Sequence, residues 1–104
     1  MRIQIDHDDH VRGSNNRSQE IEATVRGALD RFGDHVTLVQ IHLSDENGPR
    51  FSADDKRCLM EARVAHHSPI TVSHRATNLQ QAVMGAANKL ERSIDQALDR
   101  ARSH

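Results

Sequence analysis

The sequence is poor in aromatic residues: it has no tryptophan or tyrosine and only two phenylalanines among 104 residues. Aromatic rings are the platforms on which proteins stack unpaired nucleic-acid bases, so their scarcity argues against a reader of single-stranded bases. The core must therefore be built from aliphatic side chains, methionine and alanine. With 36% hydrophobic residues the chain suffices for one such core. We expect a single domain spanning residues 1–104.

Cysteine and long apolar runs are equally scarce. One cysteine, Cys58, excludes an internal disulfide bond. No apolar run approaches the roughly 20 residues needed to cross a bilayer. Asp6, Asp8 and Asp9 interrupt the N-terminal region where a signal peptide requires an apolar stretch. These absences predict a cytoplasmic protein that has no membrane partner.

The charges of the two signs nearly cancel. Fourteen basic residues are set against 15 acidic ones, which gives a formal net charge of -1. The molecule as a whole therefore has little attraction for polyanions at neutral pH. Any surface that binds nucleic acid must then be a local cluster of basic residues.

Alternating apolar and polar residues predict four strands, at residues 2–6, 35–44, 56–65 and 70–74. In the second strand this alternation places Val39 on one side and Val36 on the other. Cys58, in the third strand, falls on the side expected to face the core. The connection between the second and third strands is polar and too long for a tight hairpin turn.

Apolar residues at three- and four-residue steps predict two helices. The first is capped by Asn16 or Ser18 and ends at Gly33. The second is a long amphipathic helix at residues 78–102, which Thr77 or Asn78 can cap. A helix of this length covers most of the width of a small domain.

These elements predict an α+β fold in the order β-α-β-β-β-α. The first two strands, separated by a helix, can lie parallel, and the last three can form an antiparallel meander. The result is a four-stranded mixed sheet with both helices packed on one face. The opposite face is mainly polar and presents Arg2, Gln4, Gln40, His42, Arg57, Glu61, Arg63, Thr71 and Ser73.

Residue types that could carry catalysis or bind metal are present but poorly arranged. His7, Asp8, Asp9 and His10 are metal-ligand types, but a closed site needs ligands from a second segment, and none is indicated. A solvated loop is therefore the favoured interpretation. Cys58, on an inward strand face, is expected to behave as a small inert hydrophobe rather than as a nucleophile.

The remaining patterns also fail to indicate an enzyme. The acidic loop lacks the regular alternation of oxygen ligands that calcium needs; its residues are Asp45, Glu46, Asp54 and Asp55. The sequence has no Gly-rich phosphate loop, nucleophile elbow or pair of metal-binding histidines on a helix. We expect no catalytic residues, no metal or other cofactor and no small-molecule substrate.

The arrangement of the basic residues is more informative. Arg57 and Arg63 lie six residues apart on one strand and hence on one face, and Arg75, Lys89 and Arg92 lie in the same half of the sequence. These residues predict a local basic surface. The alternative is that Lys89 and Arg92 belong to an ordinary charged helix face, where they alternate with acidic neighbours.

The stretch from Ile70 to Arg92 contains a short strand, a polar turn, a helix with the pattern NLQQAVM, and then NKLER. The last pattern is similar to D-K-L-x-R at the corresponding place in the ribosome hibernation-promoting factor family, which includes ribosome-associated inhibitor (protein Y). With the order β-α-β-β-β-α, the chain resembles a short member of that family over nearly its whole length.

This resemblance implies a non-enzymatic module that binds the small ribosomal subunit and its ribosomal RNA. In the family such modules lie where messenger and transfer RNA would bind, and they silence or protect idle ribosomes under stress. The resemblance further implies that Lys89 and Arg92 contact phosphate groups of RNA. Arg57, Arg63 and Arg75 are further candidates for the same role.

The chain departs from the family pattern in its last helix. Gln80 occupies the place of an aromatic residue, and Asp95 and Asp99 stand where the family is rich in lysine. Because affinity for nucleic acid scales with the number of phosphates neutralised, these changes predict weaker binding with a flatter salt dependence. The alternative function is a protein interaction domain that keeps the fold but has lost ribosome binding. It would bind a partner or itself through the long helix or through the exposed strand face, where Leu38 and Leu59 stand among polar residues.

Overall fold

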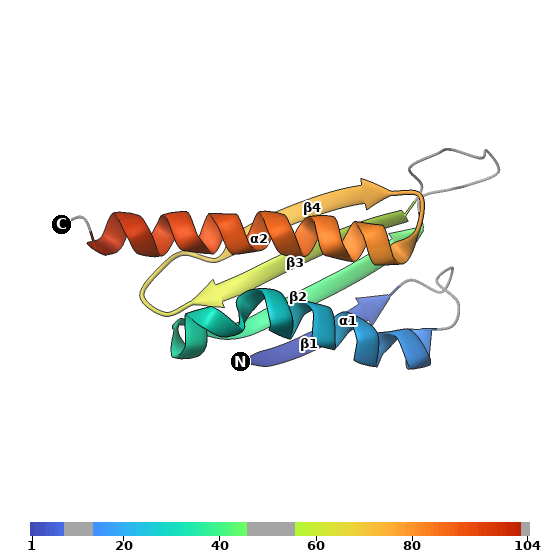
Figure 1. The fold of residues 1–104 in the computed structure, drawn as a ribbon, viewed down its shortest axis with the longest axis horizontal. Helices are drawn as coiled ribbons and strands as arrows, with labels where there is room; N and C mark the ends of the chain where they lie inside the picture. The colour runs from blue at the N-terminus through green and yellow to red at the C-terminus, as the bar shows by residue number, and fades with distance from the viewer. Residues whose placement is uncertain (8–13, 46–55, 103–104) are drawn as a thin grey trace.

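The computed structural model describes residues 1–7, 14–45 and 56–102 (Figure 1). Its elements are β1 (Arg2–His7), α1 (Ser14–Leu29), the 3-10 helix η1 (Asp30–His35), β2 (Val36–Asp45), β3 (Lys56–Val64), β4 (Ile70–Ala76) and α2 (Leu79–Arg102). The predicted α+β order β-α-β-β-β-α is confirmed, with η1 added after the first helix.

The four strands form one mixed sheet in the order β1-β2-β3-β4. β1 pairs in parallel with β2, and the other two pairings are antiparallel, as predicted. The residues of the predicted polar face share one side of the sheet, because they alternate along each strand with the core-facing residues and lie opposite one another, or opposite Leu38, Ser44, Leu59 or Arg75, in the register. Leu38 and Leu59 lie on this outer face too.

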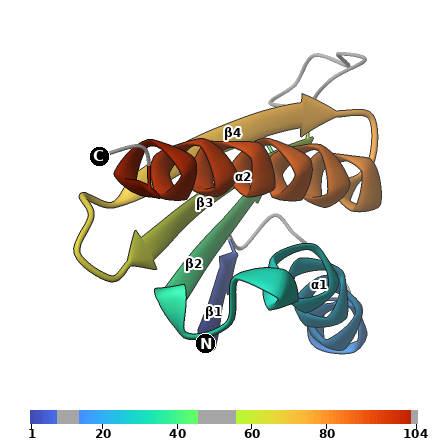
Figure 2. The ribbon, with the colours of Figure 1, turned by 60° about the vertical axis from the view of Figure 1, so that its left-hand side comes forward.

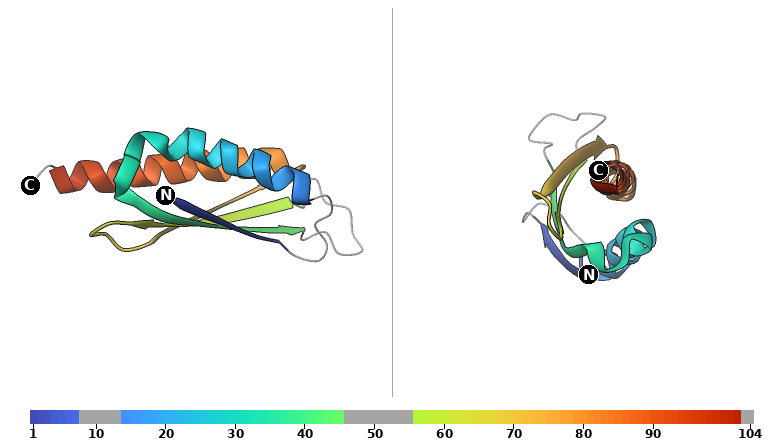
Figure 3. Two further views of the ribbon diagram at one scale, coloured as in Figure 1. Left: turned by 90° about the horizontal axis from the view of Figure 1, so that it is seen from below. Right: turned by 90° about the vertical axis from the view of Figure 1, so that its left-hand side faces the viewer.

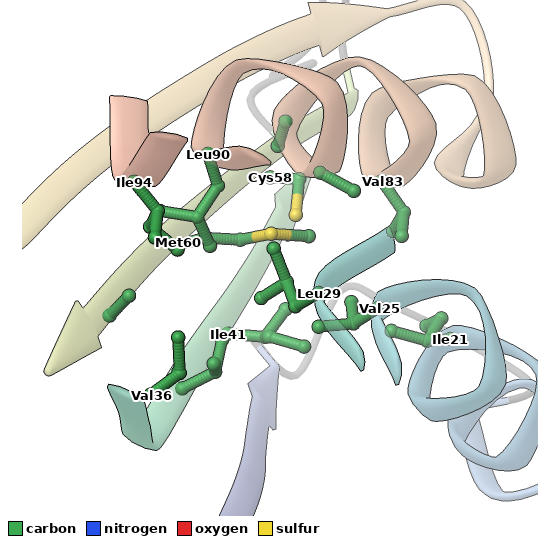
Figure 4. Close-up of a cluster of buried hydrophobic side chains, with 14 of the residues drawn as sticks. Ile21, Val25, Leu29, Val36, Ile41, Cys58, Met60, Val83, Leu90 and Ile94 are labelled. Atoms are coloured by element: carbon green, nitrogen blue, oxygen red, sulfur yellow. The ribbon is translucent and has the colours of Figure 1, made fainter. Parts of the chain in front are cut away.

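Both helices pack on the same face of the sheet (Figure 3). The core between the two layers is mainly aliphatic, with Phe32 as an aromatic member, and the described residues include no buried polar or charged side chain. Val25 of α1, Met60 of β3 and Leu90 of α2 are all fully buried at its centre (Figure 4). With so few aromatic residues, the core is filled mainly by branched aliphatic side chains, methionine and alanine.

The predicted alternation is wrong at the start of β2, because a β-bulge interrupts it there. Val36 was placed on the outer side, yet it is buried, with 1% of its surface exposed. The register shifts here: Val36 pairs with Val64 and Leu38 with Arg63, which leaves Thr37 as the extra residue. The Thr37 hydroxyl donates a hydrogen bond to the Arg63 carbonyl at 3.2 Å. Beyond the bulge the predicted alternation holds.

The first helix differs from its prediction at both ends. α1 begins at Ser14, so Asn16 and Ser18 lie within the helix rather than at its cap. It ends at Leu29, four residues before Gly33. Gly33 lies in η1 with a φ of 56°, a left-handed conformation that favours glycine, so it turns the chain into β2.

The second helix begins where the sequence predicted. The side-chain oxygen of Asn78 accepts a hydrogen bond from the backbone N–H of Gln81 at 2.8 Å, so Asn78 caps α2. The hydroxyl of Thr77 instead donates to the Gln81 side chain at 3.1 Å. At about 1.5 Å per residue the helix is roughly 36 Å long. Its apolar stripe is buried at Leu79, Ala82, Val83, Ala86, Ala87, Leu90, Ile94 and Leu98.

Candidate nucleic-acid interface

Two of the predicted cations lie side by side on the outer face of the sheet. Arg57 of β3 is directly opposite Arg75 of β4 in the antiparallel register. Side chains at such positions stand on the same face about 5 Å apart at their Cβ atoms. The sheet thus presents two guanidinium groups together, and each has the planar fork of donors that suits a phosphate.

Helix α2 brings a third cation to the same strand. The Nζ atom of Lys89 donates a hydrogen bond to the backbone carbonyl of Ser73 at 2.9 Å. Ser73 lies in β4, two residues before Arg75, so the two share the outer face. The contact fixes the Lys89 ammonium at the free edge of the sheet.

A fourth cation lies further along the exposed side of the helix. Arg92 is exposed and lies three residues after Lys89, which places it one turn further along α2. We call Arg57, Arg75, Lys89 and Arg92 the β4 basic cluster. It joins the outer face of β3 and β4 to the flank of α2, around the edge of the sheet.

Arg63 does not belong to this cluster. It shares the outer face with Arg57, as predicted, but six residues of β3 separate them. At about 3.3 Å per residue the separation is about 20 Å. Arg63 lies instead opposite Leu38, next to the bulge of β2. The alternation of a strand predicts the face of a side chain, but a shared face is not a shared site.

Two acidic residues of α2 lie toward a different element. Arg31 of η1 forms ion pairs with Glu91 at 4.0 Å and with Asp95 at 3.5 Å. Its guanidinium also lies over the ring of Phe32, 4.3 Å from the ring centroid. Glu91 and Asp95 thus face η1, whereas Lys89 bonds to the sheet. Sequence spacing carries no signal of this network, because Arg31 and Asp95 are 64 residues apart.

Cys58 lies in the core, as its place on the inward face of its strand predicted. Its side chain has no exposed surface, and burial raises the pKa of the thiol from 9.0 to about 12. The reactive thiolate is therefore strongly disfavoured at neutral pH. The arrangement gives Cys58 a packing role.

No described residues form a group of three or more histidine, cysteine or acidic side chains that could hold a metal ion. The side chains of His7, Asp8, Asp9 and His10 lie outside the described residues, as do those of the acidic loop. Within the same described part of the chain, no helix is both long and apolar enough to span a membrane.

Comparisons with known proteins identify the sequence pattern and the fold. Residues 5–102 match the model of a family described as Sigma 54 modulation protein / S30EA ribosomal protein. The structure is similar to the N-terminal domain of protein Y from Thermus thermophilus, with a TM-score of 0.72 and 18% sequence identity. That similarity covers 92% of this chain and 98% of the other.

A second solved structure has the same architecture. It is a ribosomal subunit interface protein from Coxiella burnetii, with a TM-score of 0.69 and 15% identity over 95% of this chain and 99% of the other. At these identities the two structural similarities establish the fold alone. No curated protein sequence matches the chain.

Proposed function

The chain belongs to the Sigma 54 modulation protein / S30EA ribosomal protein family, and from this premise we propose that it is a non-enzymatic module of the ribosome. It binds the small ribosomal subunit and silences or protects idle ribosomes under stress. The family match over residues 5–102 is the observation that carries this proposal. Such a role is exercised in the cytoplasm.

The β4 basic cluster is the surface that contacts ribosomal RNA. Its two guanidinium groups, Arg57 and Arg75, bind phosphate oxygens through paired N–H donors. Lys89 and Arg92 extend the contact along the flank of α2. Recognition rests on phosphates and RNA shape rather than on stacked bases, which agrees with the absence of tryptophan and tyrosine.

Lys89 is prepared for this contact by its bond to the sheet. A lysine ammonium has three N–H donors, and the Ser73 carbonyl accepts one of them at 2.9 Å. The other two remain available for phosphate oxygens. Because the flexible side chain is already held in place, less conformational entropy is lost on binding.

The binding is modest in strength and in salt dependence. Four phosphate contacts correspond to a slope of about -3 in a plot of log affinity against log salt concentration. Glu91 and Asp95, which pair with Arg31, add no further contact to the cluster. This agrees with the weaker binding expected from the acidic end of the helix.

Co-sedimentation of the full chain with purified ribosomes at two salt concentrations tests the proposal. We expect the double variants Arg57→Glu/Arg75→Glu and Lys89→Glu/Arg92→Glu each to bind at least about tenfold more weakly, since each reverses two contacts. Arg63→Glu is the matched control, because it reverses one charge on the same face outside the cluster. Thermal unfolding confirms that each variant folds.

Two outcomes would contradict the proposal at different levels. If both double variants bind as well as the unmodified protein, the assignment of the contact residues is wrong. If the unmodified protein does not co-sediment at low salt, the ribosome-binding function is wrong.

The alternative, a protein interaction domain that uses the outer sheet face, finds less support. Leu38 and Leu59 are half-buried on that face. The row formed by Gln40 and Glu61 lies between them, because Leu38 pairs with Arg63 and Leu59 pairs with His42. The two leucines therefore do not make the contiguous apolar patch that marks many protein interfaces.

A further inference from the structure

Strand β1 forms one edge of the sheet (Figure 2). It pairs with β2 and, in the part of the chain that the structure describes, with no other strand. Half of the backbone N–H and C=O groups of an edge strand point away from its neighbour and can pair with another strand. Proteins commonly protect such edges with lysine, proline or a bulge. The sequence of β1, RIQIDH, has no lysine or proline, and its register with β2 has no shift.

The two edges of the sheet differ in this respect. At β4, the ammonium of Lys89 crosses from α2 and bonds to the Ser73 carbonyl. At β1, the corresponding long-range contact is made before the strand begins, where Arg26 of α1 donates to the Met1 carbonyl at 3.3 Å. Within β1 itself, Arg2 and Asp6 are exposed.

The core side of β1 is incompletely covered as well. Ile3 and Ile5 point toward the core but are only half-buried. Their partners on β2 in the register, Val39 and Ile41, are 0% and 1% exposed. The exposed parts of Ile3 and Ile5 are therefore apolar surface that a neighbouring strand would cover.

We propose that this edge pairs with the β1 strand of a second copy of the chain, antiparallel and centred on Gln4. Arg2 and Asp6 are both exposed and lie on the outer face, two residues to either side of Gln4. In this pairing Arg2 lies opposite Asp6 of the second copy, and Asp6 lies opposite its Arg2. Directly opposed charges of unlike sign stabilise a strand pair. On the core side, Ile3 lies opposite Ile5 of the second copy.

Charge complementarity selects this register. A shift by two residues places either Arg2 or Asp6 opposite Gln4 and loses both charge pairs. A parallel pairing in register brings like charges together, which is unfavourable. A shift by one residue turns the apolar side of one strand onto the polar side of the other.

The resulting dimer has a two-fold axis perpendicular to the sheet, and the same residues of both copies form the interface. The two four-stranded sheets become one continuous sheet with all helices on one side. The β4 basic clusters lie at its two far edges, because β1 and β4 are opposite edges of each sheet. The inference goes beyond the proposed ribosome binding and does not depend on it.

Sedimentation equilibrium of the full chain over a range of concentrations tests this pairing. We expect the average mass to rise with concentration from 11.7 kDa toward twice that value. Arg2→Asp and Asp6→Arg each place like charges opposite one another, so each variant alone should associate at least about tenfold more weakly. Arg100→Asp, a reversal of the same kind on exposed α2, should leave association unchanged.

Mixing the variants provides the decisive comparison. An equimolar mixture of Arg2→Asp and Asp6→Arg should associate as the unmodified protein does. The first variant is acidic at positions 2 and 6 and the second is basic at both, so opposite charges meet in the mixed dimer. The combined variant Arg2→Asp/Asp6→Arg should dimerise by itself for the same reason. Circular dichroism confirms that each protein is folded.

The pairing is refuted if the unmodified protein stays monomeric up to about 1 mM, the weakest association worth considering. It is also refuted if the folded variants associate no better mixed than alone. If one single variant fails to fold, the combined variant still tests the pairing: it should dimerise if the pairing is right and stay monomeric if it is wrong. Co-sedimentation with ribosomes is measured separately, so failure here leaves the proposed function intact.

Discussion

At the scale of single residues, Gly85 of α2 packs directly against a side chain of the edge strand β4. The imidazole of His74 occupies the space that a Cβ atom at position 85 would need. His74 lies on the core side of β4, because it is directly opposite buried Cys58 in the register. The glycine is therefore required by packing and not by its backbone conformation.

Gly85→Ala should destabilise the protein although alanine is the better helix former. Overpacking costs about 1–3 kcal/mol, and the gain in helix propensity is about 1 kcal/mol, so we expect a net loss of up to about 2 kcal/mol. Urea unfolding measures this change. In a His74→Ala background the obstacle is gone, and the same substitution should be neutral or stabilising. An equal loss in both backgrounds would show that the imidazole is not the cause.

The buried thiol of Cys58 should make stability depend on pH in the alkaline range. Its pKa is raised from 9.0 to about 12 in the folded protein, so between these values the unfolded chain loses a proton that the folded chain keeps. The free energy of unfolding contributed by this group is therefore complete below about pH 9 and falls as pH rises toward 12, by at most about 1.4 kcal/mol per pH unit.

Urea unfolding at about pH 8 and about pH 10.5 gives this slope. Cys58→Ala is the reference, because lysine and other groups titrate equally in both proteins. We expect the slope to be steeper with cysteine than with alanine. Identical slopes would mean that the thiol ionises as easily in the folded protein as in the unfolded one.

At the scale of elements, the sequence predicted most accurately the segments whose pattern is long and regular. The stripe of α2 and the alternation of β3 each continue for many residues, so their faces follow from periodicity. The start of α1 was missed because Ser14, Asn15 and Asn16 carry no apolar residue to reveal a helix. Val36 was misplaced because a bulge adds one residue without leaving a mark in the pattern.

The cap of α2 gives a prediction for an element end. Asn78→Ala removes the acceptor for the Gln81 N–H, now bonded at 2.8 Å, and should cost about 1 kcal/mol of stability. Asn78→Asp keeps a side-chain acceptor and should stay within a few tenths of a kcal/mol of the original. Thermal unfolding of the two variants compares them directly. If both lose the same stability, the hydrogen bond is not what stabilises this end of the helix.

At the scale of the whole molecule, the sequence indicated the candidate basic residues but not which of them lie close together. Four of the five candidates gather because α2 runs back along β4, and the bond from Lys89 to Ser73 fixes that alignment. Arg63 lies about 20 Å from Arg57 along its strand and so outside the cluster. Sequence spacing could not reveal either fact, since both depend on how distant elements pack together.

The segregation of charge on α2 has a consequence for how the molecule moves in an electric field. Lys89 lies toward β4 and Asp95 lies toward η1, while the charges of the whole chain nearly cancel to a net value of -1. Opposite charges separated across a nearly neutral body form a dipole. For these two residues the separation favours an approach in which the edge at β4, rather than the side at η1, turns toward a negative surface.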